Sequence, residues 1–191
     1  RINGCMERSM NGEAMPEKSL EMKAMIAYIE FLSQDVPAEK ETEYKGFVKV
    51  KLPEVKADLV QGEAVFIKHC QTCHMSDGQG QRPDKSGLYV YPPLWGNDTY
   101  NHGAGMHRVI TSAQFIKGNM PHLQATWDNP ILTDDEAYNV AAYINSFDRA
   151  QKSNPENHLF VSQAIYVFAG NSKRVTRSPL ATSLTVRPIG S

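Results

Sequence analysis

Cysteine is scarce in this sequence, with three among 191 residues, which is too few for a disulfide framework. The chain also lacks an apolar run long enough to span a membrane. Neither sign of charge is in excess: 20 basic and 21 acidic residues leave a formal net charge of −1, which gives no indication of nucleic-acid binding. No signal peptide is visible, but the chain begins at Arg1 and not at Met, so this absence carries no information.

Two of the three cysteines belong to the motif Cys70-Gln71-Thr72-Cys73-His74, the attachment signature of a c-type haem. The two thiols can form thioethers with the vinyl groups of one porphyrin, and His74 then serves as an axial iron ligand. A bare Cys-x-x-Cys pair would also suit a redox dithiol or half of a zinc site. The adjacent histidine argues against both, because a zinc site would need further ligands in a second cluster. Covalent haem c implies an extracytoplasmic compartment, and we expect the periplasm.

The order of motifs over residues 58–149 is that of a small all-α cytochrome c. A first helix with Gly62, Val65 and Phe66 leads into the haem motif, and a loop-rich segment follows. We expect a second helix around residues 106–117. The residues from Thr133 to Glu136 form a capping box that predicts the last helix, and Gly62 would allow this helix to cross the first one closely near Tyr143.

The flanking segments carry weaker signals. Residues 1–36 resemble the end of a larger unit, with an amphipathic helix whose apolar stripe needs partners: Met22, Met25, Ile26, Ile29 and Leu32. Residues 37–57 are rich in Pro, Lys and Glu and predict an extended linker. Residues 150–191 form a tail of uncertain structure, in which the apolar run at 161–170 suits a strand.

An electron-transfer haem needs a sixth ligand, and methionine is the usual choice. Met120 is the favoured candidate because Pro121 keeps it out of helical geometry at the end of a helix. Met106 is the main competitor, although its place in a helical pattern suits a core residue better. Lys117 and His122 are weaker candidates, which would ligate the iron through a nitrogen atom.

Cys5 is the third cysteine and lies between Arg1 and Arg8. The residues alone leave two readings open, a buried structural thiol and a thiolate stabilised by cationic neighbours. This segment, with Met10-Asn11-Gly12 after it, resembles the motif around the cysteine ligand of the active-site haem in tetrathionate-forming thiosulfate dehydrogenases, which are dihaem cytochromes c. The helix, the linker, the second haem motif and Asn119-Met120-Pro121 then follow in family order. The resemblance covers residues 1–149.

The resemblance implies a function and a set of roles. Two thiosulfates would be joined by an S–S bond to give tetrathionate, releasing two electrons. Cys5 resembles the sulfur ligand of the catalytic haem iron, Arg1 resembles a substrate-binding arginine, and Arg8 and Ser9 would lie nearby. Guanidinium groups suit this role because they offset the repulsion between two dianions. The haem at Cys70 and Cys73 would accept electrons and pass them to a soluble or membrane-bound cytochrome.

The resemblance also implies a missing part. Family members attach the catalytic haem through their own Cys-x-x-Cys-His upstream of the Cys5 motif, and this chain has one such motif. We therefore expect residues 1–36 to be the end of a catalytic cytochrome c domain, and the chain to be an inactive fragment with one of two haems. The alternatives are a monohaem electron carrier, and a sulfur-oxidation cytochrome that conjugates thiosulfate to a carrier protein.

Overall fold

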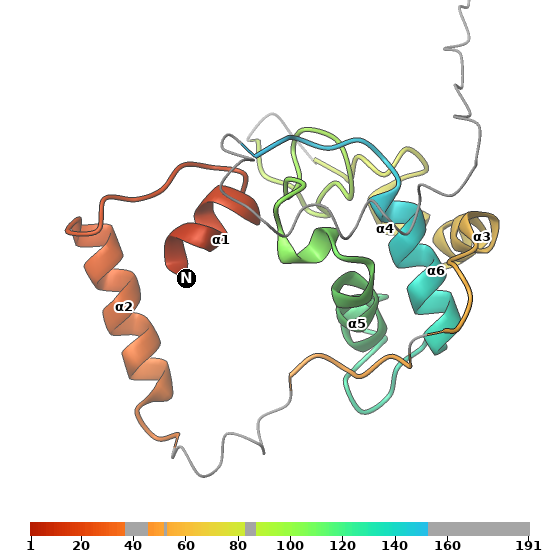
Figure 1. Ribbon diagram of the computed structural model, residues 1–191, viewed down its shortest axis with the longest axis horizontal. Coiled ribbons are helices and arrows are strands. Elements are labelled where there is room, and N and C mark those ends of the chain that lie inside the picture. The colour runs from red at the N-terminus through yellow and green to blue at the C-terminus, as the bar shows by residue number, and fades with distance from the viewer. Residues whose placement is uncertain (37–45, 52, 83–86, 153–191) are drawn as a thin grey trace, which may run out of the picture.

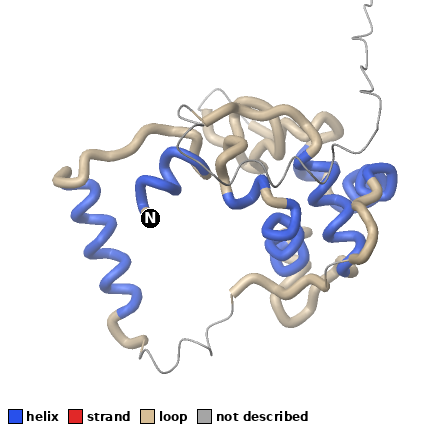
Figure 2. The backbone as a smooth tube through the Cα atoms, viewed as in Figure 1, coloured by secondary structure: helices blue, strands red, loops and turns tan. Residues whose placement is uncertain are grey.

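The computed structural model describes residues 1–36, 46–51, 53–82 and 87–152, and the regular elements within these ranges are all helical (Figures 1 and 2). They are α1 (Ile2–Arg8), α2 (Leu20–Ser33), α3 (Leu59–His69), α4 (Gln71–His74), the 3-10 helix η2 (Gly105–His107), α5 (Val109–Asn119) and α6 (Asp134–Asn145). The predicted all-α fold is confirmed. None of the helices in these ranges has the length and apolar character needed to cross a membrane.

The core forms where α3 crosses α6, and Gly62 is the residue that permits this crossing. A Cβ atom at position 62 would lie 2.3 Å from the carbonyl oxygen of Asn139 and 2.8 Å from Cβ of Tyr143. Because only glycine leaves this space free, the two helix backbones come into direct contact. The predicted close approach of the first and last helices near Tyr143 is confirmed.

Four aromatic rings fill the space beside this crossing. Trp95 stacks on Phe147 with ring centroids 4.0 Å apart, and Phe66 lies 5.3 Å from Trp95 and 5.6 Å from Tyr143. Gly78, which has a φ of +68°, approaches the Trp95 ring so closely that a Cβ atom would overlap it. Because Gly78 has no side chain, the loop after the haem motif can pack directly on the Trp95 ring of the core.

The start of α6 is fixed by the predicted capping box. The Thr133 hydroxyl accepts a bond from the Glu136 backbone, and the Glu136 carboxylate accepts one from the Thr133 backbone (2.9 Å). Asp134, in the first turn, also pairs with Lys117 from the last turn of α5. These bonds tie the end of α5 to the start of α6 across the loop that contains Met120.

The helix expected at residues 106–117 begins later and ends later than its sequence pattern suggests. Met106 lies in η2, and α5 begins at Val109 after Arg108 adopts an extended backbone with φ −80° and ψ 118°. The expected assignment of Met106 to this helix was therefore wrong. Periodicity did not reveal the break, because a 3-10 turn and an α-helix place apolar residues at similar spacings over one turn.

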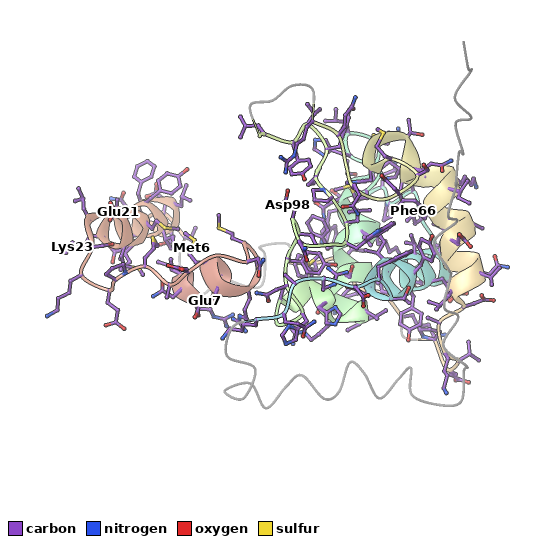
Figure 3. All side chains as sticks on the ribbon, turned by 90° about the horizontal axis from the view of Figure 1, so that it is seen from above. Met6, Glu7, Glu21, Lys23, Phe66 and Asp98 are labelled. Carbon is purple, nitrogen blue, oxygen red and sulfur yellow. The ribbon has the colours of Figure 1, made fainter. Side chains whose placement is uncertain are left out.

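Residues 58–149, with the helices α3 to α6, form the cytochrome-like part. Helices α1 and α2 lie to one side of it in both views (Figures 1 and 3). Met22 is the one buried residue of α2. Met25 is half-buried, and the large apolar residues that are exposed are Leu20, Ile26, Tyr28, Ile29, Phe31 and Leu32. Most of the stripe thus lacks partners among the described residues. The expected strand at 161–170 lies outside those residues, as do residues 37–45 and 52 of the expected linker.

Candidate haem site

The haem motif lies at the junction of α3 and α4. Cys70 ends α3, and its carbonyl oxygen accepts bonds from the backbone N–H groups of Cys73 (3.2 Å) and His74 (3.0 Å). This single turn brings the two thiols, both free and half-buried, onto one short segment. The local geometry suits attachment of one porphyrin through two thioethers.

His74 is held in a defined orientation. Its side chain is buried, and its Nδ1 atom lies 2.8 Å from the carbonyl oxygen of Pro92. A carbonyl oxygen only accepts hydrogen bonds, so Nδ1 carries the proton and the lone pair is on Nε2. A ring fixed by such a bond is typical of histidines that ligate metals.

The structure argues against a zinc or dithiol site at Cys70 and Cys73. Within the described ranges, no group of three or more His, Cys, Asp or Glu side chains is arranged to hold a metal ion. Burial, together with the neighbouring Cys73, raises the pKa of the Cys70 thiol to about 12. Thiol–disulfide exchange needs a thiolate, which such a pKa disfavours. A half-buried pair of thiols beside a fixed histidine fits haem c.

Met120, the predicted sixth ligand, lies at the end of α5 beside the core. It ends α5 with an extended backbone (φ −125°, ψ 140°), as predicted from the proline that follows. Its side chain is partly buried against the core, and the other apolar residues that border the core in this way include Cys70, Leu94, Val109 and Ile110. Cys70 and Met120 are 50 positions apart in the sequence, and both border the same core.

The competing ligands are placed less favourably. Lys117 is engaged with Asp134, and His122 is exposed on the loop after Met120. Met106 is half-buried in η2, where its backbone carbonyl accepts a bond from Asn145 (3.2 Å). Met120 therefore stays the predicted sixth ligand.

Cys5 lies apart from the core and is exposed in the middle of α1, so the described residues do not bury this thiol. Arg1 precedes α1 and Ser9 follows it, and both are exposed. Arg8 folds back over its own helix, where Nε donates to the carbonyl oxygen of Gly4 (2.9 Å). Its guanidinium group therefore lies beside the residue that precedes Cys5.

Asn101 and Arg149 are two of the buried polar residues that the sequence did not reveal. Asn101 is 1% exposed and joins α1 and the residues just after it to the cytochrome-like part. Arg149 is 6% exposed, its guanidinium carbon lies 4.2 Å from the centre of the Tyr100 ring, and its Nη2 donates to the carbonyl oxygen of Ile144 (3.0 Å). Burial lowers the pKa of Arg149 from its ordinary value. Neither residue belongs to a motif, so only the folded structure reveals them.

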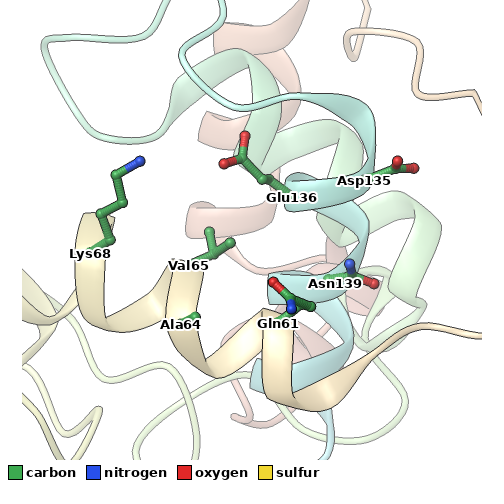
Figure 4. Close-up of a pocket in the computed structure, with 7 residues that line it drawn as sticks. All are labelled: Gln61, Ala64, Val65, Lys68, Asp135, Glu136 and Asn139. Atoms are coloured by element: carbon green, nitrogen blue, oxygen red, sulfur yellow. The ribbon is translucent and has the colours of Figure 1, made fainter.

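A shallow groove between α3 and α6 is separate from these residues (Figure 4). Seven residues line it: Gln61, Ala64, Val65, Lys68, Asp135, Glu136 and Asn139. The lining includes neither a cysteine nor a histidine. The groove therefore has no part in the candidate haem site.

Comparisons with known proteins agree with this geometry. Residues 59–148 match the family model Cytochrome c. The chain is 44% identical over 157 residues to a thiosulfate dehydrogenase of Psychrobacter arcticus, and 40% identical over 151 residues to one of Stutzerimonas stutzeri. These matches cover 82% and 79% of this chain, and 46% and 47% of the two relatives.

A solved structure is also similar, that of the thiosulfate dehydrogenase (TsdBA) from Marichromatium purpuratum in its as-isolated form. The TM-score is 0.71 at 40% sequence identity, and the match covers 80% of this chain and 33% of that chain. The resemblance to thiosulfate dehydrogenases is thus confirmed, and the domain is of the haem c type. The chain spans about half the length of the curated relatives it matches.

Proposed function

We propose that this chain, a homologue of the thiosulfate dehydrogenases, is the electron-exit part of a periplasmic enzyme that oxidises two thiosulfates to tetrathionate. One S–S bond forms, and two electrons leave the two sulfur atoms that join. The observation that carries the proposal is the pairing, within one chain, of a haem motif whose histidine is fixed by Pro92 with a cysteine helix of the same family pattern. The matches to thiosulfate dehydrogenases over about 80% of the chain support it.

Four residues of the cytochrome-like part would hold the cofactor. Cys70 and Cys73 would form the thioethers, and His74 and Met120 would be the axial ligands. When bound, haem c supplies the one-electron exchange that lets electrons leave for an external acceptor cytochrome. Pro92 keeps the proton on Nδ1 of His74, which leaves Nε2 free to act as a ligand. A thioether ligand from Met120 would favour the reduced state of the iron.

The residues of α1 would serve the chemistry on sulfur. Cys5 is exposed and so is accessible to a second, catalytic haem that the rest of the protein would supply. Arg8 has its guanidinium anchored by Gly4 in the same helix, and Arg1 stands at the start of that helix. Both are suited to bind the dianionic substrate, because an arginine can offer forked donors to sulfonate oxygens. Ser9, at the end of the helix, would lie close to that substrate.

The test uses the full-length, haem-loaded protein with thiosulfate and an artificial one-electron acceptor. We expect one tetrathionate for every two electrons delivered to the acceptor. Electron delivery without free tetrathionate, and with sulfur bound to a carrier protein, would favour the conjugating cytochrome. If thiosulfate fails to reduce the protein, the result would favour the other alternative, a monohaem electron carrier.

A further inference from the structure

Asn101 connects two segments that are more than 90 positions apart in the sequence. Its backbone N–H donates to the carbonyl oxygen of Arg8 (3.0 Å), and its Nδ2 donates to the carbonyl oxygen of Glu7 (2.7 Å) and to Oδ1 of Asn11 (3.0 Å). The side chain is 1% exposed. Three hydrogen bonds therefore run from one buried residue of the cytochrome-like part to the end of the Cys5 helix.

The Cys5 helix depends on these bonds because it has little else to hold it. Helix α1 is seven residues long and none of them is buried. The other hydrogen bonds of α1 among the described residues stay within the N-terminal segment. They include the pair between Asn3 and Met15 (2.9 Å each) and the bond from the Gly12 N–H to the carbonyl oxygen of Met6 (2.9 Å). A helix this short is not stable alone in water. Asn101 supplies the donors that the last carbonyl groups of α1 would otherwise lack.

The loop that carries Asn101 is shaped for this contact. Oδ1 of Asn101 accepts a bond from the Gly103 backbone (3.1 Å), which fixes the side-chain amide so that Nδ2 points to α1. A Cβ atom at Gly103 would lie 3.3 Å from Cδ of Lys152 and 3.6 Å from Cδ of Arg8. The backbone at Gly103 thus packs between side chains from both segments. Glycine at this position allows the approach.

We infer that Asn101 is a positioning residue that fixes the Cys5 helix on the haem domain, and so sets the path by which electrons from thiosulfate reach the haem at Cys70 and Cys73. This inference rests on the proposed function. Oxidation of two thiosulfates releases two electrons, and the haem held by Cys70, Cys73 and His74 would supply the one-electron exchange that carries them away from the Cys5 helix. The rate of such a transfer falls steeply with distance, so loosening α1 slows it.

The test compares two aspartate variants in the full-length, haem-loaded protein. Asn101→Asp keeps the acceptor for Gly103 but turns both donors into a carboxylate facing the oxygens of Glu7 and Asn11. Asn145→Asp is the matched control: Asn145 is also buried, but its Nδ2 donates to Met106 and Ala141 within the haem domain. Both variants lose buried amide donors, and only the first faces α1.

Two readouts are needed. Hydrogen exchange of the Ser9 and Met10 amides, which both bond to the Cys5 carbonyl, reports on α1. We expect Asn101→Asp to lower their protection by about tenfold or more, as for loss of a buried hydrogen bond. Rapid mixing with thiosulfate reports the reduction rate of the haem at Cys70 and Cys73, which we expect to fall in Asn101→Asp alone. Haem content and the spectrum of that haem should match the wild type.

Three results would overturn the inference: wild-type protection and rate in Asn101→Asp, equal losses in both variants, or loss of protection without a slower rate. If Asn101→Asp does not load haem, Asn11→Gly decides, because it removes only one acceptor and glycine tolerates the φ of +50° found there. A smaller loss in both readouts supports the inference, and wild-type values contradict it. A wild-type protein that thiosulfate cannot reduce would instead refute the proposed function, while the exchange readout would still report on α1.

Discussion

The Nδ1 atom of His74 lies 2.8 Å from the carbonyl oxygen of Pro92, 18 positions away. This bond connects the haem motif to the loop that carries Trp95, and Trp95 is part of the aromatic core. The orientation of the predicted iron ligand is therefore set by the packing of the whole domain.

Replacement of Met120 by alanine should remove the absorption band at the red end of the spectrum that arises from a bond between methionine sulfur and ferric iron. The thioethers of Cys70 and Cys73 do not involve Met120, so haem content should stay unchanged. Visible spectra of the oxidised protein provide the measurement. Met106→Ala is the control and should keep the band. Loss of the band in the Met106 variant alone would reassign the ligand.

Replacement of Gly62 by alanine should destabilise the domain, although alanine favours helices. The added Cβ meets backbone atoms of α6 at Asn139, which cannot move away as a flexible side chain could. We expect a net loss of about 2 kcal/mol in the free energy of unfolding, since overpacking outweighs the gain of about 1 kcal/mol in helix propensity. Gly46→Ala is the control, because no atom lies within 4 Å of a Cβ at that position. Denaturant unfolding of both variants would show the difference, and equal stabilities would disprove the tight crossing.

Replacement of Cys5 by alanine in the full-length protein should abolish turnover of thiosulfate. The haem at Cys70 and Cys73 should load normally, because Cys5 lies outside the core. Turnover and haem content are measured on the same preparation. Met6→Ala, which changes the next residue of α1, should retain activity. Turnover at the wild-type rate in Cys5→Ala would mean that this cysteine has no catalytic role.

The pair of Asp134 and Lys117 predicts a specific dependence of stability on pH. A hydrogen bond from Lys117 is the main cause that lowers the pKa of Asp134 below its ordinary value of 3.8. Because the folded pKa is lowered, the stabilisation is present above pH 3.8 and is lost as the pH falls through the folded pKa. Asp134→Asn should therefore cost about 0.5 kcal/mol at neutral pH, as for partly exposed ion pairs.

The measurement for this pair is urea unfolding at several pH values. The difference between Asp134→Asn and the wild type should vanish in strong acid. Asp135→Asn, in the same helical turn, is the control for the effect of the helix N-terminus alone and should cost less. A difference that persists unchanged into strong acid would show that the effect does not come from ionised Asp134.

The haem motif, the crossing at Gly62 and the capping box at Thr133 could be predicted from sequence because each depends on residues close together or on one steric requirement. The exposed position of Cys5 could not be predicted, since nothing local distinguishes a buried thiol from an exposed one. Asn101 was also missed. Its partners lie about 90 positions away, and a single asparagine in a loop carries no signal of burial.

The boundary of α5 was misplaced for a related reason. Apolar spacing continues through η2 into α5, and the extended backbone at Arg108 that separates them has no marker such as glycine or proline. The exposed surface of α2 is the opposite case. Its stripe was recognised as needing partners, and the described residues bury only Met22 from that helix.

The central claim is that this chain carries the electron-exit haem of a two-haem enzyme. The ratio of covalent haem to protein, measured by intact-mass spectrometry on the full-length gene product and on this chain, tests it most directly. We expect two haems on the full-length protein and one on this chain, with the single haem lost in a Cys70→Ala, Cys73→Ala double variant. One haem on the full-length protein would contradict the account and leave a monohaem electron carrier.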